Sequence, residues 1–309
     1  MKKILAIMPV SIGGRLTTSS FIDGFIQNGY KVIVFDELKN DKIQNLKNFE
    51  FEYIIGYDFS PVKIKIDNNI KIPLIAYFSD DIRKKTSGVG YDKYIKFIKN
   101  KDIFVFYWDR ELAKKENLFY QPHFVNCEIY HDFKTPLNDV LFMGRLDTDL
   151  RLKTYLELNK LLPDISFRWY AIKRHFEDAL KRCNENDKKI IQNTYCGFID
   201  NEIDMAKIIN ESKIVYNINA QGLSSLNYRT IQTLACKRLI ISDKRKELDL
   251  FNNIIPTYDN INDLASKIKF YLNNKEEYNK IIDKSYGFIL KNHSSKICVK
   301  NMLDKIKLF

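Results

Sequence analysis

The chain has 309 residues, a length typical of two domains of about 150 residues each. Its 45% hydrophobic and 29% charged residues, with 11 Gly and 7 Pro, exclude collagen-like and low-complexity architectures, and 21 Phe and 18 Tyr argue against disorder. The 50 basic residues exceed the 39 acidic ones by 11, which favours an anionic partner: a nucleotide, nucleic acid, phosphorylated sugar or acidic membrane surface.

The first half of the chain alternates apolar runs with helical or loop segments. Residues 3–10 form a continuous apolar run, as expected of a parallel strand buried on both faces. A turn at 11–14 and a helix over 16–28, closed by Gly29, are predicted to follow. The further predicted strands of this half are 30–36, 51–57, 72–79, 102–108 and 118–124.

A polar stretch at 126–138, flanked by Pro122 and containing Pro136, predicts a connection between domains, after which the alternation restarts. The predicted strands of the second half are 139–144, 166–172, 194–199, 213–219, 238–242 and 254–258, and its predicted helices are 149–162, 202–211, 228–236, 261–273, 276–291 and 295–307. This order predicts an α/β fold of two Rossmann-like, doubly wound domains, 1–134 and 135–309, facing a cleft. The C-terminus is helical, with the last helix free to pack back on the first domain.

The loop at 218–229 carries the strongest indication of a ligand. It runs from a predicted strand into a helix, contains one Gly, two Ser and two Asn, and places Arg229 in the first helical turn. Backbone amides at a helix N-terminus, together with a guanidinium, suit a diphosphate. A polar loop with a surface arginine is the alternative interpretation, and the pattern alone does not decide between them.

A family resemblance enters at the same place. Residues 225–236 read SLNYRTIQTLAC and residues 239–243 read LIISD. This passage resembles the C-terminal signature of group 1 glycosyltransferases of the GT-B fold, and is most similar to the CgeB-like, spore-protein-like branch. Weaker similarities, including Tyr195-Cys196-Gly197, extend it over most of residues 118–309. Gln232 stands where the family has a Glu that binds the donor ribose, and Lys237 stands where it has a Gly.

The resemblance implies an enzyme that moves a sugar from a nucleotide-diphosphate sugar to an acceptor hydroxyl, in the synthesis of a cell-surface glycan or glycoconjugate. The expected partners are this donor and a glycan, lipid-linked or protein acceptor, with no cofactor beyond the donor. The absence of a metal and of a nucleic-acid partner is predicted from other patterns, given below. The predicted donor-binding residues are Gly144, Arg145, Lys173, Cys196, Gly197, Asn219, Ser224, Ser225, Asn227, Tyr228, Arg229 and Gln232.

Candidate residues of the first half follow two predicted strands. Gly13, Gly14 and Arg15 follow the first strand, where relatives often have a Gly pair that lets the acceptor or the transferred sugar approach the backbone; a bare turn is the alternative interpretation. Asp80 and Asp81 follow the strand at 72–79, and one of these carboxylates is the candidate catalytic base for the acceptor hydroxyl. A helix cap is the alternative for this pair, and Asp109 is a weaker candidate.

Asp147-Thr148-Asp149 has the D-x-D form of a metal motif, but it precedes a helix and is interpreted as a cap. The four His show no ligand spacing, so no metal site is predicted. Five Cys without a CxxC pair favour a reducing cytoplasm. The apolar run at the N-terminus is too short for a signal peptide or a membrane span. A peripheral position at the inner membrane face stays open.

Two other functions remain compatible with the sequence. A sugar-nucleotide epimerase also uses two Rossmann-like halves, and a degenerate subunit that only binds a nucleotide-sugar would account for Gln232. A nucleic-acid binder fits the charge, but the sequence lacks an aromatic RNP pattern, helix-turn-helix spacing and a basic tract.

Overall fold

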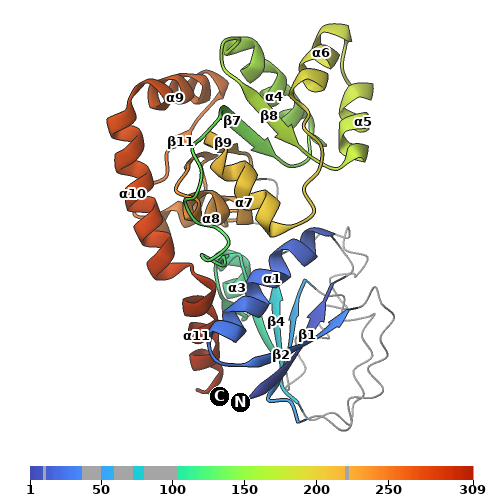
Figure 1. Cartoon of the computed structure of the whole chain (residues 1–309), viewed down its shortest axis with the longest axis vertical. Coiled ribbons are helices and arrows are strands. Elements are labelled where there is room, and N and C mark those ends of the chain that lie inside the picture. The colour runs from blue at the N-terminus through green and yellow to red at the C-terminus, as the bar shows by residue number, and fades with distance from the viewer. Residues whose placement is uncertain (10–11, 37–49, 59–71, 80–102, 220–222, 309) are drawn as a thin grey trace. The chain divides into compact units, whose positions relative to one another are not determined.

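A computed structural model describes residues 1–9, 12–36, 50–58, 72–79, 103–219 and 223–308 (Figure 1). The chain divides into two compact units. Unit 1 comprises Met1–Asn126, Gln221–Ser225 and Lys291–Phe309, and unit 2 comprises Cys127–Ala220 and Leu226–Leu290. The chain therefore first passes from one unit to the other at residue 126, and its C-terminal segment belongs with the N-terminal sheet.

Unit 1 contains a parallel sheet with the strand order β2-β1-β3-β4-β5-β6. Continuous apolar sequence produces it: all five residues of β4 are buried, as expected where helices cover both faces. Its strands are β1 (Lys3–Met8), β2 (Lys31–Asp36), β3 (Tyr53–Tyr57), β4 (Leu74–Phe78), β5 (Ile103–Tyr107) and β6 (Phe119–Tyr120).

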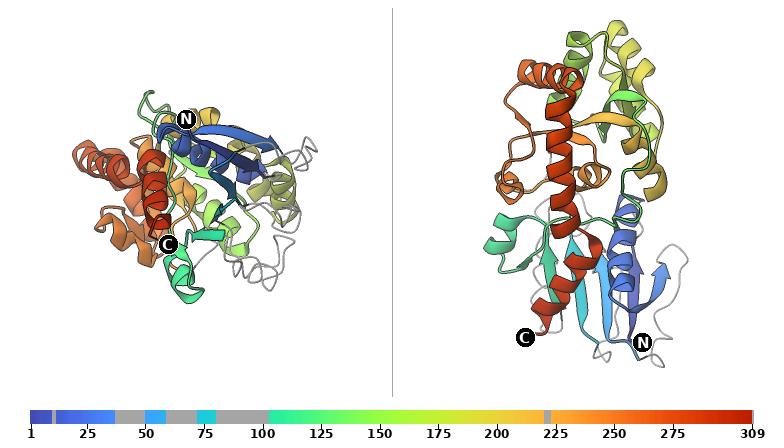
Figure 2. Two further views of the ribbon diagram at one scale, coloured as in Figure 1. Left: turned by 90° about the horizontal axis from the view of Figure 1, so that it is seen from below. Right: turned by 60° about the vertical axis from the view of Figure 1, so that its left-hand side comes forward.

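The described helices of unit 1 are α1 (Ile12–Gln27), α3 (Arg110–Lys115) and α11 (Ser295–Ile306). Helix α11 lies beside α1, far away in sequence (Figures 1 and 2). Gly24 allows this close approach, because a Cβ there would lie 2.5 Å from Val299 Cγ2 and 2.8 Å from the Ser295 carbonyl oxygen. The two ends of the chain are thus packed into one hydrophobic core.

Unit 2 contains a second parallel sheet, with the order β11-β10-β9-β7-β8. Its strands are β7 (Asn138–Met143), β8 (Phe167–Tyr170), β9 (Ser212–Asn217), β10 (Leu239–Asp243) and β11 (Thr257–Tyr258). Its helices are α4 (Asp149–Leu161), α5 (Lys173–Lys181), α6 (Glu185–Thr194), α7 (Glu202–Asn210), α8 (Tyr228–Ala235), α9 (Ile261–Asn273) and α10 (Lys275–Asn292), with a 3-10 helix at Lys246–Phe251. The expected pair of parallel α/β units is confirmed.

The strand predicted at 194–199 is wrong. Helix α6 continues to Thr194, and Tyr195 makes only an isolated bridge to Trp169. Gly197 then adopts a φ of +103°, which turns the chain out of an extended path. The aromatic residues that suggested a strand serve another purpose, since the Tyr195 ring stacks on Phe176 with centroids 4.2 Å apart.

A buried pair of histidines lies in unit 1. His123 and His293 are 6% and 3% exposed, and His293 Nδ1 donates a hydrogen bond to the His123 carbonyl oxygen at 2.8 Å. Burial lowers the pKa of His123 to about 3, aided by the neighbouring His293, and burial lowers the pKa of His293 to about 4. Both rings are therefore neutral in the folded protein at neutral pH.

This burial predicts a steep acid sensitivity. The pKa values of both histidines are lower in the folded than in the unfolded protein, so between about pH 6.5 and pH 4 unfolding is accompanied by proton uptake. The free energy of unfolding is therefore unaffected by these histidines above about pH 6.5 and decreases as the pH is lowered through this range. The pair should give the free energy of unfolding a slope of about 2.7 kcal/mol per pH unit near pH 5. His123→Gln should remove about half of it in urea titrations at several pH values; an unchanged slope would contradict neutral burial.

Candidate active site

The first strand of unit 2 marks the place where a ligand is expected. Strand β7 has β8 on one side and β9 on the other, so the strand order reverses there. In open parallel sheets, ligands bind in the crevice at the carboxyl ends of the strands beside such a reversal. The chain leaves β7 at Gly144 and leaves β9 at Ile218, so residues near these two points form the candidate site.

Arg229, in the first turn of α8, lies directly against the end of β7. A Cβ added to Gly144 would lie 3.0 Å from Arg229 Nη2, and Gly144 has a φ of +136°. Arg229 Nη1 is 3.4 Å from Asn217 Oδ1 on β9. The guanidinium therefore spans the ends of β7 and β9, at a position where only a glycine leaves room for it.

Two further arginines surround this guanidinium. Arg151 is 5% exposed, and its Nη2 donates to the Ile218 carbonyl oxygen at 2.8 Å. Asp147 pairs with Arg151 at 3.4 Å and with Arg145 at 3.3 Å. Burial, reinforced by Arg151 and Arg145, lowers the pKa of Arg229 to about 9. Three guanidinium groups with one paired carboxylate are arranged to receive an anion with more than one charge.

The loop between β9 and α8 is held by polar side chains on neighbouring strand ends. Asn219 Nδ2 donates to Asp243 Oδ1 at 2.6 Å, and Asn219 Oδ1 accepts the Asn227 backbone amide at 3.0 Å. Asn227 is the N-cap of α8, but its side chain makes no capping bond, since it donates to Asn217 Oδ1 instead. Asn219 and Asn227 thus fix the entry to the helix that carries Arg229.

The two serines of this loop belong to unit 1. Ser224 and Ser225 are fully buried, and the Asp109 carboxylate accepts their backbone amides at 2.9 and 3.2 Å. Asp109 also caps α3 by accepting the Leu112 amide at 3.0 Å. A carboxylate that is 0% exposed and engaged in this way is not available as a base, so the weaker candidacy of Asp109 is withdrawn.

Gln232 and Tyr228 belong to a polar cluster of unit 2 that also contains Tyr130 and the buried Glu202. Gln232 is 3% exposed, and its Nε2 donates to the Tyr130 hydroxyl at 2.6 Å. The Tyr228 hydroxyl lies 3.4 Å from Glu202 Oε1. Burial and the adjacent Glu202 raise the pKa of Tyr130 well above its ordinary value. In this structure the Gln232 amide is engaged by Tyr130.

Three other predicted donor residues lie at the end of β8. Lys173 begins α5 with its side chain 84% exposed and is 3.9 Å from Glu177. Cys196 is exposed, and its amide donates to the Trp169 carbonyl oxygen at 2.8 Å, while the Gly197 carbonyl oxygen accepts from Ala171. They therefore flank β8, one strand away from the arginines at the β7–β9 boundary.

The predicted loop of unit 1 has a different structure from the expected turn. Helix α1 begins at Ile12, so Gly13 and Gly14 lie in its first turn, which corrects the expectation of a turn over 11–14. Arg15 forms a two-point ion pair with Asp36 at 2.6 and 2.8 Å. Asp80 and Asp81, the candidate bases, lie outside the described residues.

The D-x-D sequence caps a helix, as predicted. Thr148 is the N-cap of α4, and its hydroxyl accepts the Arg151 amide at 3.3 Å. Asp147 pairs with Arg145 and Arg151, and Asp149 pairs with Arg182 at 2.6 Å. Within the described ranges, no group of three or more His, Cys, Asp or Glu side chains could hold a metal ion.

Sequence reasoning missed Arg151, Asn217 and Asp243. Arg151 lies in the first turn of α4, the helix that follows β7, and a basic residue at the start of a helix that follows a buried strand was a usable signal. Asn217 and Asp243 end β9 and β10, and polar residues terminating buried parallel strands are a signal of the same kind.

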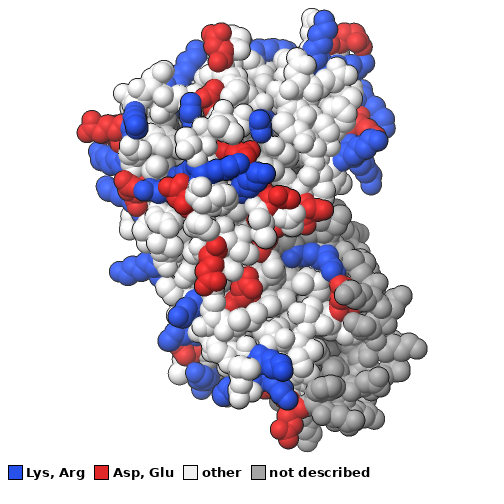
Figure 3. Space-filling model, viewed as in Figure 1, with Lys and Arg blue, Asp and Glu red and all other residues white. Residues whose placement is uncertain are grey.

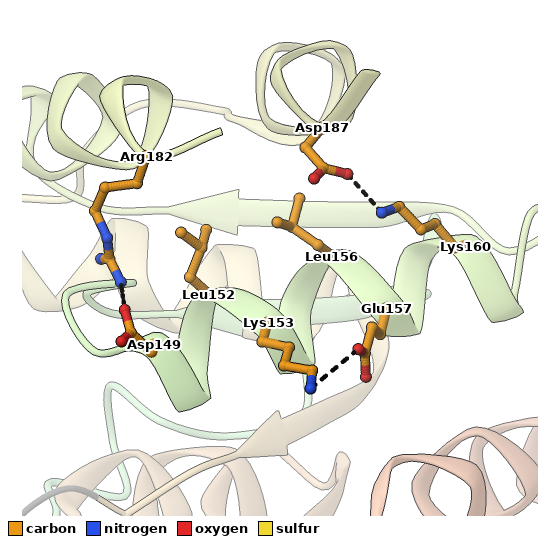
Figure 4. Close-up of a pocket in the computed structure, with 8 residues that line it drawn as sticks. All are labelled: Asp149, Leu152, Lys153, Leu156, Glu157, Lys160, Arg182 and Asp187. Carbon is orange, nitrogen blue, oxygen red and sulfur yellow. Dashed lines mark hydrogen bonds and ion pairs between the residues drawn. The ribbon is translucent and has the colours of Figure 1, made fainter. Parts of the chain in front are cut away.

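A depression of about 510 Å³ lies elsewhere in unit 2, against α4 (Figure 4). Leu152 and Leu156 form its apolar part, and the charged side chains around it pair with one another, as Lys160 does with Asp187 at 2.6 Å. Its lining is completed by Asp149, Lys153, Glu157 and Arg182. Because its charges are internally balanced, it lacks the excess charge that distinguishes the arginine cluster.

The net positive charge is not gathered into one patch on the face shown in Figure 3, where basic and acidic side chains are interspersed. Among the described helices, none is both long and apolar enough to span a bilayer.

Comparison with known proteins places this geometry in context. Residues 158–304 match a family model described as "Glycosyl transferase-like". No curated protein sequence matches the chain. Among solved structures, an alpha-glucosyltransferase in complex with UDP and a 13-mer DNA containing an HMU base superposes with a TM-score of 0.72 at 16% identity, covering 99% of both chains.

Two further structures agree over the whole length. Sucrose-phosphate synthase from Thermosynechococcus elongatus gives a TM-score of 0.69 at 11% identity, covering 100% of this chain and 99% of the other. The Anabaena protein HepE in complex with UDP gives 0.67 at 10% identity, covering both chains fully. The chain has the GT-B fold. The family model matches residues 158–304, which include Arg229 but not Gly144. The close approach of Arg229 to Gly144 therefore connects the matched region to the end of β7, which lies outside it.

The first site prediction concerns Gly144. Gly144→Ala should lower the free energy of unfolding by about 1–3 kcal/mol and displace Arg229, because the residue has a positive φ and its new Cβ would touch the guanidinium. Two controls separate the causes in urea unfolding. Gly197→Ala has the positive φ without neighbours within 4 Å, and Gly287→Ala in α10 has neither constraint and should stabilise the helix. Equal costs at 144 and 197 would mean that the Arg229 contact contributes nothing.

The second concerns Gln232, which stands where the resembled family has a ribose-binding Glu. From that position alone, Gln232→Glu is expected to leave the fold intact and to maintain or improve donor affinity. The buried surroundings lead to a different expectation for stability. A glutamate would lose the hydrogen bond donated to Tyr130 and bring a second carboxylate to the hydroxyl that already faces Glu202, lowering the free energy of unfolding by about 1–3 kcal/mol at neutral pH. The loss should shrink on acidification as the new carboxyl becomes protonated. If the Gln232→Glu variant had the melting temperature of the wild type at both neutral and acidic pH, the hydrogen bond between Gln232 and Tyr130 would not contribute to stability.

Proposed function

We propose that this protein is a glycosyltransferase that transfers a sugar from a nucleotide-diphosphate sugar to an acceptor hydroxyl. The observation that carries the proposal is Arg229, a mostly buried guanidinium without a carboxylate partner among the described residues, placed at the strand-order reversal of unit 2. Solved structures with this fold include complexes with UDP, which supports a nucleoside diphosphate as the anion.

The proposed chemistry follows from the charge of the leaving group. As the bond between the sugar and the diphosphate breaks, negative charge increases on the diphosphate oxygens. Arg229, Arg145 and the amides at the start of α8 would stabilise that charge from fixed positions, which is more effective than recruiting mobile water. We propose that this cluster works without a metal and that no further cofactor takes part.

The proposal assigns the remaining roles as follows. Gly144, Asn219, Asn227 and Tyr228 shape the donor site, and Lys173, Cys196 and Gly197 flank it at β8. Asp80 or Asp81 would remove the proton from the acceptor hydroxyl. A glycan, lipid-linked or protein acceptor at the cell surface is proposed, with synthesis in the cytoplasm.

Arg229 provides the central test. Arg229→Ala should weaken UDP binding roughly ten- to a hundredfold, because a charge-assisted hydrogen-bond pair contributes about 1.5–3 kcal/mol. Arg229→Lys should recover only part of the affinity, since an ammonium lacks the planar fork. Lys181→Ala, an exposed cation on α5, is the matched charge control. Calorimetry showing wild-type affinity in Arg229→Ala would move the phosphate site to Arg145 or Lys173.

Metal independence is tested separately. UDP, GDP, CDP and TDP should be compared by thermal shift with and without EDTA, and at least one should raise the melting temperature by the same amount in both conditions. Stabilisation that disappears with EDTA would show that a divalent ion takes part in binding.

Product analysis distinguishes the alternatives. An epimerase would interconvert UDP-sugars without an acceptor, whereas a binding-only subunit would bind nucleotide and release none from a UDP-sugar. The acceptor screen should include glycans, lipid-linked sugars and, because one similar structure holds it, a 13-mer DNA with an HMU base. Glucosylation of that DNA would replace the proposed acceptor.

A further inference from the structure

An asparagine just beyond the end of β9 faces two partners at once. Asn219 Nδ2 donates to Asp243 Oδ1 at 2.6 Å, and Asn219 Oδ1 accepts the Asn227 amide at 3.0 Å. Asp243 ends β10, Asn227 is the N-cap of α8, and all three residues belong to unit 2. The buried Asn219 side chain is therefore a bridge between the end of a strand and the start of the helix that carries Arg229.

The backbone of Asn219 is held from the same direction. Asp243 Oδ1 also accepts the Asn219 backbone amide at 3.0 Å, and Asp243 Oδ2 lies 3.4 Å from Arg245 Nε. Arg245 Nη2 in turn donates to the Asn219 carbonyl oxygen at 2.6 Å. Because both the N–H and the C=O of Asn219 are restrained, the side-chain bridge starts from a fixed backbone.

The chemistry of the partners sets the orientation of the Asn219 amide group. A carboxylate only accepts hydrogen bonds, and a backbone N–H only donates one. The amide nitrogen must therefore face Asp243 and the amide oxygen must face Asn227, because the reversed group would place oxygen against oxygen and N–H against N–H. Ser242 Oγ accepts Asn219 Nδ2 at 3.2 Å, but a hydroxyl can donate or accept and does not impose this choice.

The N-terminus of α8 is docked on strand ends rather than capped by its own side chain. Asn227 makes no side-chain capping bond: its Nδ2 donates to Asn217 Oδ1, and its Oδ1 accepts the Thr230 hydroxyl at 3.4 Å. An Asn at this position usually accepts an amide of the first turn. Arg229 Nη1 reaches the same Asn217 oxygen at 3.4 Å. A continuous set of hydrogen bonds thus joins Asp243 to the first turn of α8 and to the Arg229 guanidinium.

We propose that Asp243 is a positioning residue of the phosphate site: by fixing Asn219 it sets the position of the first turn of α8 and of Arg229. The role in nucleotide binding rests on the proposed function, whereas the anchoring of α8 does not. Packing of the buried residues of α8 places the helix as a whole, and Asp243 determines how its first turn meets the end of β9.

The charge of Asp243 would act on an anion in the opposite direction. Burial lowers the pKa of Arg151, and Asp243 is one of the acids that counteract this shift, so its charge is felt within the arginine cluster. A carboxylate in this place repels a bound diphosphate. If Asp243 acted through its charge alone, its removal would strengthen UDP binding, whereas loss of positioning weakens it. The sign of the effect therefore separates the two roles.

Two substitutions that leave the same charge isolate the accepting oxygen. Asp243→Asn keeps an oxygen for the Asn219 N–H groups, whereas Asp243→Ala removes it. Asp139→Ala is the matched control, since the Asp139 and Asp243 side chains are both 25% exposed. Asp139 pairs with Lys213 at 2.8 Å and accepts the Ser166 amide at 3.1 Å, but it lies at the start of β7. Hydrogen exchange of individual amides and calorimetry with UDP are measured on the full-length variants.

In Asp243→Ala we expect the Asn227 amide to exchange at least about tenfold faster, while amides of β7 keep their protection, and UDP affinity to fall about tenfold. Asp243→Asn should bind UDP at least about tenfold more tightly than Asp243→Ala, and should recover most of the protection of the Asn227 amide. In Asp139→Ala, both UDP affinity and exchange at Asn227 should equal those of the wild type.

Equal UDP affinities for the two Asp243 variants would overturn the positioning role, as would tighter binding in Asp243→Ala than in the wild type. Unchanged exchange of the Asn227 amide in Asp243→Ala would overturn the anchoring. If the wild-type protein bound none of UDP, GDP, CDP and TDP, the proposed function would fail instead. The exchange comparison would then still decide whether Asp243 anchors the start of α8.

Discussion

The candidate site depends on the positive charge of Arg229, which is partly removed from water and has no carboxylate partner among the described residues. A guanidinium in such a place lowers the stability of the folded chain, as its depressed pKa indicates, and two neighbouring arginines add to the repulsion. Other residues support the position: Gly144 leaves space, Asn217 supplies an acceptor, and the buried Trp169 donates its indole N–H to the Gly144 carbonyl oxygen at 2.8 Å. Residues at the ends of β7 and β9 thus hold an uncompensated positive charge at the point where the strand order of unit 2 reverses.

The polar residues near this imbalance serve different purposes, although they look alike in sequence. Asn219 and Asn227 bond to neighbouring strand ends, the amides of Ser224 and Ser225 bond to Asp109, and Gln232 bonds to Tyr130. Part of the hydrogen-bonding capacity of these polar residues is therefore used within the protein itself. Arg229 has no carboxylate partner among the described residues, and Arg145 shares Asp147 with Arg151, so the cluster keeps an excess of positive charge, as the proposed phosphate site requires.

Hydrophobic runs were sufficient to predict both sheets, because strands buried on two faces must be apolar throughout. The same reasoning failed at 194–199, where Tyr195 and Phe198 suggested a strand but Gly197 turns the chain. It also failed to recognise Arg151, since a helix period does not reveal which of its polar positions faces a strand end. The D-x-D segment could be assigned because capping is local chemistry, whereas the contacts of Asp109 join residues more than 100 positions apart and left no periodic trace.

The exchange of chain segments between the units has a consequence for synthesis. Unit 2 is almost contiguous in sequence, but unit 1 is completed only when residues 291–309 add α11 to the face of α1 around Gly24. Because residues 291–309 follow unit 2 along the chain, the core of unit 1 can be completed only after all of unit 2 has been synthesised. The core of unit 2 can therefore close before that of unit 1, although the sheet of unit 1 is synthesised first.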